Sequence, residues 1–219
     1  VVDFYLRNFD LFKKIIATGN DRDNKAWQDL SISFEFIGAH RTVSGFSGAL
    51  NFDTVQETAV INNRASQKNL NIKIDSDINY IFSVPLAKVG TLIARDYTVN
   101  HITANEAIKK QFEQEDALIS KINKLLKEYL NLELKYHTLP PPTVKILNID
   151  IYKSGTNTKM NFNQLSSGQR SIFSLIFLVV GLEIENGFLV IDEPELHLHP
   201  RLQKKYFELL KKFSQDSGL

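Results

Sequence analysis

Two adjacent carboxylates, Asp192 and Glu193, come directly after the apolar run Phe188–Ile191. An apolar run of this length predicts a buried parallel strand, which delivers the residues that follow it to the carboxyl edge of its sheet. Open α/β sheets bind their ligands at that edge. The alternative is a strand end with two solvated acids that leads into a turn at Pro194. The apolar residues before the pair and the proline after it favour the ligand site.

A second candidate is the segment Ser166–Gln169, which precedes the nearly uncharged stretch Ser171–Leu182. The first amides of a helix have no intrahelical partners, and the helix dipole attracts anions to that end. Ser166 can donate its hydroxyl, and Gly168 lets an anion approach the backbone closely. Taken alone, a Ser-Ser-Gly segment before a helix is more often an ordinary cap.

The order of these elements resembles ABC-type ATPases, in which a signature loop and an apolar helix precede the Walker B strand. The continuation Glu195–Pro200 narrows the resemblance. Transporter subunits of that superfamily usually have a Thr after Asp-Glu-Pro and then a Ser-Ala-Leu-Asp-like D-loop. This chain instead resembles the soluble AAA/ABC-hybrid ATPases related to RecF and the OLD (overcoming lysogenisation defect) nucleases. The resemblance covers Asn161–Phe213, and more loosely Phe36–Arg41.

The resemblance implies an α/β, P-loop NTPase-like ABC ATPase head, with helices on both faces of its sheet. Such a head binds ATP and Mg²⁺ and works as a homodimer or higher homo-oligomer around the nucleotide. Asp192 would hold the metal through water, and Glu193 would be the catalytic residue that polarises the attacking water. The resemblance assigns nucleotide contacts, partly across the dimer interface, to Ser166, Ser167, Gly168, Gln169, His197 and His199.

Two functions follow from this resemblance. The first is an ATP-hydrolysing head that controls DNA processing or an anti-phage effector. The second is a scaffold, held together by ATP with little turnover, that sequesters or positions a nuclease or toxin. A transporter subunit is disfavoured by the segment after Pro194. A bulky charge at Gly168 is expected to block ATP-driven dimerisation and to leave the monomer folded.

No Gly-rich loop ending in Gly-Lys-Ser/Thr, which would hold the β- and γ-phosphates, is found in the chain. Gly38, Gly45 and Gly48 are followed by Ala39, Phe46 and Ala49. The switch histidine that the resemblance implies is expected on a strand just beyond Leu219. We therefore expect a portion of a longer polypeptide, or pieces of one with gaps closed up, that is inactive alone.

Composition sets further bounds. A chain of 219 residues with 43% hydrophobic residues can bury a core, and its net charge of +1 favours neither nucleic acid nor an acidic surface globally. Zero cysteines exclude disulfides and thiolate metal sites, and they fit a reducing cytoplasm. Charged residues interrupt any secretory apolar region near Val1. The apolar stretch is shorter than the roughly 20 residues that span a membrane.

We divide the chain into residues 1–102, a partial ATPase lobe, and residues 103–219, the signature and Walker B portion. In the first part, alternation of apolar and polar residues predicts strands at Leu30–Ile37 and Asn69–Ile74. Arg41–Leu50 is rich in Gly and Ser and is expected to be a loop. Val55–Gln67 predicts a weakly amphipathic helix.

In the second part, a capping box at Thr103 begins one helix whose apolar face runs to Tyr129. Strands are expected at Leu132–His137 and Val144–Tyr152, followed by a turn at Gly155. Pro200 is well placed to be the first residue of the last helix.

Several charged residues have two interpretations. The last helix carries a solvated face, with DNA contact as the lesser alternative, made of Lys204, Lys205, Lys211 and Lys212. His197 and His199 could form a metal pair, but no third ligand is recognisable nearby. Arg41 and Arg170 are phosphate or interface residues, or else ordinary surface arginines.

Overall fold

The computed structural model describes residues 34–37, 46, 48–51, 80–138, 146–181, 183, 188–191, 193–196 and 198–216. The predicted helix Val55–Gln67 and the predicted strand Asn69–Ile74 lie outside these residues, as does most of the predicted loop before Leu50.

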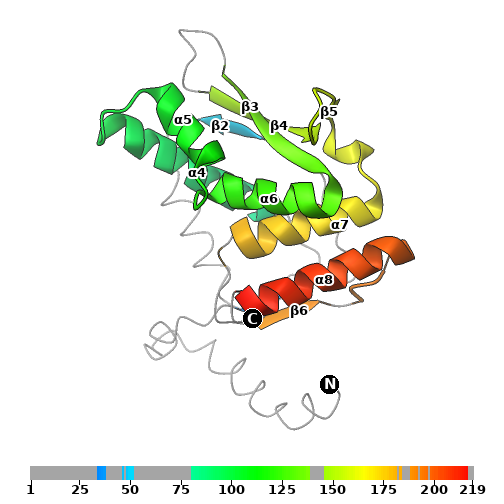
Figure 1. Ribbon diagram of the computed structural model, residues 1–219. Helices are drawn as coiled ribbons and strands as arrows, with labels where there is room; N and C mark the ends of the chain where they lie inside the picture. Colours follow the sequence, from blue (N-terminus) through cyan, green and yellow to red (C-terminus); the bar gives the residue numbers. More distant parts are fainter. Residues whose placement is uncertain are drawn as a thin grey trace, which may run out of the picture.

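The larger sheet is antiparallel (Figure 1). Its central strand, β4 (Ile146–Lys153), pairs with β3 (Leu132–Thr138) on one side. On the other side it pairs with the short strands β2 (Ala49–Asn51) and β5 (Lys159–Met160). Gly155, with φ at +71°, lies in the turn that connects β4 to β5. The predicted strands Leu132–His137 and Val144–Tyr152 are confirmed as β3 and β4, with ends shifted by one or two residues. The predicted turn at Gly155 is confirmed as well.

Three helices precede this sheet in the chain: α4 (Tyr80–Thr98), α5 (Ala104–Glu113) and α6 (Leu118–Leu130). The capping box at Thr103 is confirmed. The single helix predicted from there to Tyr129 is wrong, because the chain leaves the helix at Gln114, where ψ is 128°. The stretch 113–116 is wholly exposed, so no core contact holds it in helical form.

The nearly uncharged stretch forms α7 (Ser167–Ile176), which continues into a π-helical turn, η2 (Phe177–Gly181). Both are largely buried, and they pack against α4 and α6. At Gly181 an added Cβ would lie 2.5 Å from Cγ of Pro85 in α4, so only glycine allows this approach. The apolar stretch is therefore a buried helix that packs between neighbouring elements. Within the described residues, no helix combines the length and apolar character that crossing a membrane requires.

Aromatic rings fill the centre of the core. Phe173 and Phe177 of α7 and η2 stack with ring centroids 5.0 Å apart, and Phe82 of α4 meets Phe177 edge-on at 5.1 Å. Phe46 and Phe162 add further edge-on contacts to the same rings. Edge-on and stacked arrangements are the favourable ones for aromatic pairs, so this cluster fixes α7 against α4.

The remaining strands form a separate parallel pair. β1 (Phe34–Ile37) and β6 (Phe188–Ile191) run in register from Phe34 opposite Phe188 to Ile37 opposite Ile191. The last helix, α8 (Pro200–Asp216), begins at the predicted proline and lies beside α7 (Figure 1). This pair confirms the predicted parallel strand before the acids.

The architecture differs from the expectation in one respect. The parallel pair fits an α/β fold, but the larger sheet among the described residues is antiparallel, and the described helices that contact it are α4 and α6. Its residues alternate between the buried Leu132 and Leu134 and the polar Glu133 and Lys135. A face lined with ion pairs needs no covering layer, whereas parallel sheets are covered on both faces. β1 contacts β6, and α4 contacts α5, so contacts cross the expected domain boundary at residue 102. The division into two domains stays a prediction.

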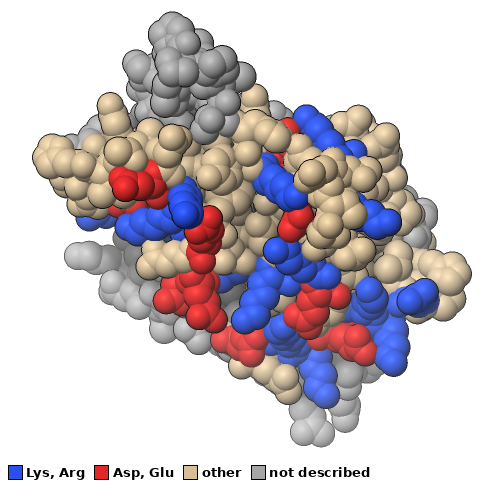
Figure 2. Space-filling model, turned by 45° about the horizontal axis from the view of Figure 1, so that its top comes forward, with Lys and Arg blue, Asp and Glu red and all other residues tan. Residues whose placement is uncertain are grey.

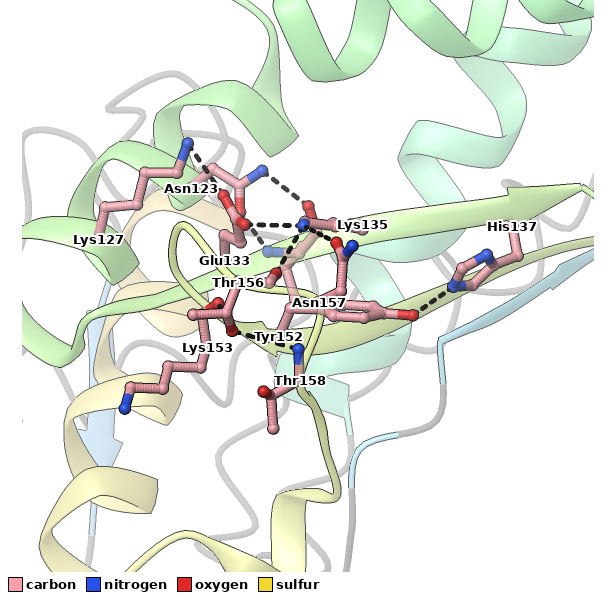
Figure 3. Close-up of polar contacts among 11 residues, drawn as sticks. Asn123, Lys127, Glu133, Lys135, His137, Tyr152, Lys153, Thr156, Asn157 and Thr158 are labelled. Carbon is pink, nitrogen blue, oxygen red and sulfur yellow. Dashed lines mark hydrogen bonds and ion pairs between the residues drawn. The ribbon is translucent and has the colours of Figure 1, made fainter.

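Ion pairs and hydrogen bonds organise the outer face of this sheet (Figure 3). Glu133 lies 3.1 Å from Nζ of Lys135 and 3.2 Å from Nζ of Lys127. Burial raises the pKa of Glu133, but hydrogen bonds from these two lysines and their charges outweigh it and hold the pKa below its usual range. The hydroxyl of Tyr152 lies 2.6 Å from Nε2 of His137. The ion pairs of Glu133 and Asp150 with lysines therefore make this face internally paired. Figure 2 shows acidic and basic groups interspersed over one side of the molecule.

Candidate functional site

The carboxyl ends of β1 and β6 lie side by side, because Ile37 is opposite Ile191. Glu193 follows two residues after this point and is exposed. Its φ of +44° lies in the left-handed region, which non-glycine residues rarely adopt. Asp192 lies outside the described residues. The predicted catalytic carboxylate is thus at the carboxyl edge of a parallel strand pair, where α/β sheets bind ligands.

Successive turns connect Glu193 to α8. The amide of Leu196 donates to the carbonyl oxygen of Glu193 at 3.0 Å, and the amide of Leu198 donates to that of Glu195 at 3.0 Å. His199 is exposed, and its Nδ1 accepts a hydrogen bond from the amide of Arg201 at 3.4 Å. This histidine therefore contributes to the start of α8 here. His197 lies outside the described residues.

The loop before α7 forms a capping box. The amide of Gln169 donates to Oγ of Ser166 at 3.2 Å, and the amide of Ser166 donates to Oε1 of Gln169 at 2.9 Å. Two amides that were expected to face an anion are therefore bonded within the loop. Because Oγ of Ser166 acts as the acceptor, its hydroxyl hydrogen can still be donated to a ligand.

Gly168 also makes a packing contact. It is buried, and a Cβ built on it would lie 2.7 Å from Cδ1 of Leu202 and 3.1 Å from Cδ2 of Leu198. A side chain at this position would therefore displace the flexible ends of these leucines near the start of α8. The nucleotide contact of Gly168 and the effect of a bulky charge there stay predictions.

This contact joins the two predicted site segments within one chain. The loop before α7 rests on Leu198 and Leu202, and the same short segment leads back to Glu193. Neither leucine was predicted to lie at the site. Their spacing of four residues, with Leu202 in the apolar stripe of α8, was the available signal.

The lysines of α8 are not a uniformly solvated face. Nζ of Lys205 donates to the carbonyl oxygen of Tyr129 at 2.6 Å, and Nζ of Lys212 lies 3.0 Å from Oε2 of Glu128. The hydrogen bond to Glu128 raises the pKa of Lys212 above its usual value, against a smaller effect of burial. Both lysines therefore tie α8 to the end of α6.

The described residues are compatible with a Mg²⁺ ion that binds together with a nucleotide. They contain no group of three His, Asp or Glu side chains that could hold a metal ion by itself. Mg²⁺ in nucleotide sites keeps several waters and uses one or two carboxylates together with phosphate oxygens. An exposed carboxylate at a strand end, such as that of Glu193, fits that pattern. Asp192 stays the predicted metal residue and Glu193 the predicted catalytic residue.

Comparison with known proteins gives two results. Residues 8–218 match the family described as "AAA ATPase domain". Among solved structures, the chain is similar to the Smc head domain with an extended coiled coil, bound to the C-terminal domain of ScpA, from Pyrococcus furiosus. That similarity has a TM-score of 0.36 and 14% identity, and it covers 99% of this chain and 46% of the Smc chain. This chain thus spans less than half the length of that structure. No curated protein matches.

Proposed function

Since this chain belongs to the AAA ATPase domain family, we propose that it is the ATP-binding and hydrolysing head of an ABC-type ATPase that dimerises around its nucleotide. In this proposal Glu193 acts on the nucleotide of its own protomer. The loop of Ser166, Ser167, Gly168 and Gln169 contacts the nucleotide of the partner, with His197 and His199 at the interface between the protomers.

The proposed chemistry rests on Glu193. Its carboxylate accepts a hydrogen bond from a water molecule and aligns it for in-line attack on the γ-phosphate. Mg²⁺, when bound near Asp192, would neutralise charge on the phosphate oxygens. The N-terminal end of α7 directs the positive end of its dipole and the hydroxyl of Ser166 toward the partner's γ-phosphate. Since the capping box occupies two amides, phosphate binding through them requires the side chain of Gln169 to release the amide of Ser166 and Oγ of Ser166 to release the amide of Gln169.

One observation carries this proposal: an exposed glutamate stands just beyond a parallel strand pair, in a backbone conformation that costs free energy. Unfavourable backbone conformations persist where the surrounding structure enforces them, and they concentrate at functional sites. Left-handed φ values also occur at His101, Asn131 and Glu183, so the place of Glu193 just beyond the parallel strand pair is what distinguishes it.

The Glu193→Gln variant of the intact protein tests the proposal. It keeps the shape of the side chain and removes the base, so ATP binding should persist while hydrolysis falls by about 100-fold or more. Because hydrolysis reopens the dimer, the variant should remain dimeric in ATP, which sizing with and without ATP measures. Glu195→Gln is the matched control, since Glu195 is an exposed acid in the same turn. A Glu193→Gln protein that turns over at the parental rate contradicts the assignment.

The biological output is part of the proposal as well. We infer that ATP-driven closure controls DNA processing or an anti-phage effector such as a nuclease or toxin. Measuring turnover with and without DNA distinguishes a DNA-stimulated enzyme from an ATP-held scaffold. ATP-dependent association without turnover in the parental protein would favour the scaffold.

A further inference from the structure

Three basic side chains of α8 form an exposed stripe. Arg201, Lys204 and Lys211 are exposed, and their spacing places them on one side of the helix. Lys204 lies 3.9 Å from Glu208, and both side chains are more than half exposed, so this ion pair is weak. No ion pair joins Arg201 or Lys211 to another residue of the described part. These three residues, together with Phe207, form the α8 stripe.

Phe207 gives the stripe an apolar centre. It follows Lys204 by three residues and precedes Lys211 by four, so all three share one side of the helix. Its exposed fraction is 47%, and the only other large apolar side chains exposed in the described part are Tyr97 and Val99 of the α4–α5 connection. An exposed aromatic residue with a charged rim is typical of a surface that binds another protein.

The turn between α5 and α6 carries the opposite charge. Glu113, Glu115 and Asp116 are exposed there. Glu113 pairs with Lys109 at 3.6 Å, whereas Glu115 and Asp116 form no ion pair with another described residue. The dipole of α6 offsets only about half an elementary charge, which is less than these two carboxylates carry. The acidic turn is therefore complementary in charge to the α8 stripe.

The acidic turn and the α8 stripe are far apart within one chain. α8 contacts the C-terminal end of α6, where Nζ of Lys212 lies 3.0 Å from Oε2 of Glu128 and Nζ of Lys205 reaches the carbonyl oxygen of Tyr129. Asp116 precedes the opposite end of α6, and a helix of 13 residues is about 20 Å long. An acidic partner for the stripe must therefore come from another molecule.

We propose that the α8 stripe of one copy of this chain binds the acidic α5–α6 turn of a second copy. Opposite charges steer such an association and fix its orientation, and Phe207 adds apolar area at its centre. Nucleic acid fits the stripe less well, because the exposed Glu208 lies beside Phe207 and repels phosphates.

This contact differs in kind from the proposed dimer around ATP. The two surfaces are different parts of the chain, so the contact is heterologous and joins copies head to tail, into rings or longer assemblies. It uses no nucleotide and none of the residues proposed for hydrolysis. The inference therefore goes beyond the proposed function and is tested separately from it.

The test is sedimentation of the intact protein without nucleotide, over a range of concentrations at low and at high salt. The parental protein should associate at low salt and dissociate at high salt, because salt screens exposed charges. Lys204→Glu with Lys211→Glu should raise the dissociation constant at least about 10-fold, because the reversed charges repel the acidic turn. Glu115→Lys with Asp116→Lys should do the same. The four substitutions together should recover association, since the two surfaces are then complementary again.

Lys121→Glu with Lys124→Glu is the matched control. Both lysines are exposed on α6, and their reversal changes the net charge as much as reversal of the two stripe lysines does. This variant should associate like the parental protein. Phe207→Ala should weaken association at low salt, and thermal melting shows that each variant is folded.

Four outcomes would overturn the inference. The first is a parental protein that shows no salt-dependent association without nucleotide. The second is a loss in the Lys121, Lys124 control equal to that in the Lys204, Lys211 variant, since net charge alone then explains both. The third is a four-residue variant that does not recover association, because the acidic turn is then not the partner. The fourth is a stripe whose lysines are needed to bind labelled duplex DNA but not for association between copies, which makes it a nucleic-acid surface.

Discussion

The proposed catalytic residue, Glu193, also has an unfavourable backbone conformation. Its φ of +44° places a β-carbon in a region where it crowds the neighbouring carbonyl oxygen. A long charged side chain gains nothing locally from this conformation. The conformation is instead enforced by the turns that follow, through the hydrogen bonds to Leu196 and Leu198. Stability and function therefore make opposite demands at this position.

Comparing Glu193→Gly with Glu193→Ala isolates the free-energy cost of the left-handed backbone at this position. Both variants remove the carboxylate, and only glycine adopts a positive φ without strain. The glycine variant should be the more stable by about 1 kcal/mol. Denaturant unfolding of the two variants measures the difference. At Glu195, whose φ is not positive, the order should reverse, with the alanine variant more stable. Equal stabilities at position 193 would show that the conformation is not strained.

At the scale of elements, the buried carboxylate of Asp96 joins the end of α4 to α5. Asp96 accepts hydrogen bonds from Nδ2 of Asn100 at 2.6 Å and from Nζ of Lys110 at 2.9 Å, so the end of α4 is joined to α5. Burial raises the pKa of Asp96, but these hydrogen bonds and the nearby positive charges outweigh it and hold the pKa below its ordinary value of 3.8. Folding therefore favours the ionised form.

Asp96 should make stability depend on pH in the acid range. A carboxyl group whose pKa is lowered by folding stabilises the protein above its unfolded pKa, and this stabilisation is lost as the pH falls through the folded pKa. Asp96→Asn should cost about 1 to 3 kcal/mol at pH 7. The difference in unfolding free energy between Asp96→Asn and the parental protein should shrink below pH 3.8, the ordinary pKa of this carboxyl group.

Thermal unfolding from pH 7 to pH 3 measures this dependence. Glu113→Gln is the control, because its ion pair with Lys109 at 3.6 Å is well exposed and contributes little at either pH. A constant difference between Asp96→Asn and the parental protein across this range would contradict the assignment.

At the scale of the whole molecule, the described part joins segments that are distant in the sequence. β1 pairs with β6, and Lys205 of α8 reaches the carbonyl oxygen of Tyr129 in α6. The contacts therefore join β6, α7 and the antiparallel sheet into one packed structure. The phosphate loop that such a site requires is not found in the 219 residues.

Residues 1–219 alone should accordingly bind Mg-ATP very weakly. Most phosphate contacts in this fold come from that loop, and each charge-assisted hydrogen bond lost removes about 1.5 to 3 kcal/mol. Several such losses weaken binding by orders of magnitude. Calorimetric titration with ATP and Mg²⁺ measures this, and Glu193→Gln should change little in the isolated chain. Micromolar binding would reveal another nucleotide site and would reopen the assignment of residues 1–102.

Interactions between near neighbours could be predicted from the sequence. The capping box at Thr103, the start of α8 at Pro200 and the turn at Gly155 depend on residues within a few positions of one another. The capping box at Ser166 was anticipated as the ordinary alternative to an anion site. Strand alternation likewise predicted β3 and β4, because the side-chain period of a strand is local.

Contacts between distant residues were decided by the tertiary structure. The break at Gln114, the helix tethers of Lys205 and the packing of Gly168 against Leu202 depend on which elements meet. A glycine before a helix suits an anion or a close neighbour equally well, and sequence spacing does not distinguish them. The left-handed conformation of Glu193 has the same origin, because the turns that enforce it end at Leu198, whose place is set by burial against the first turn of α7.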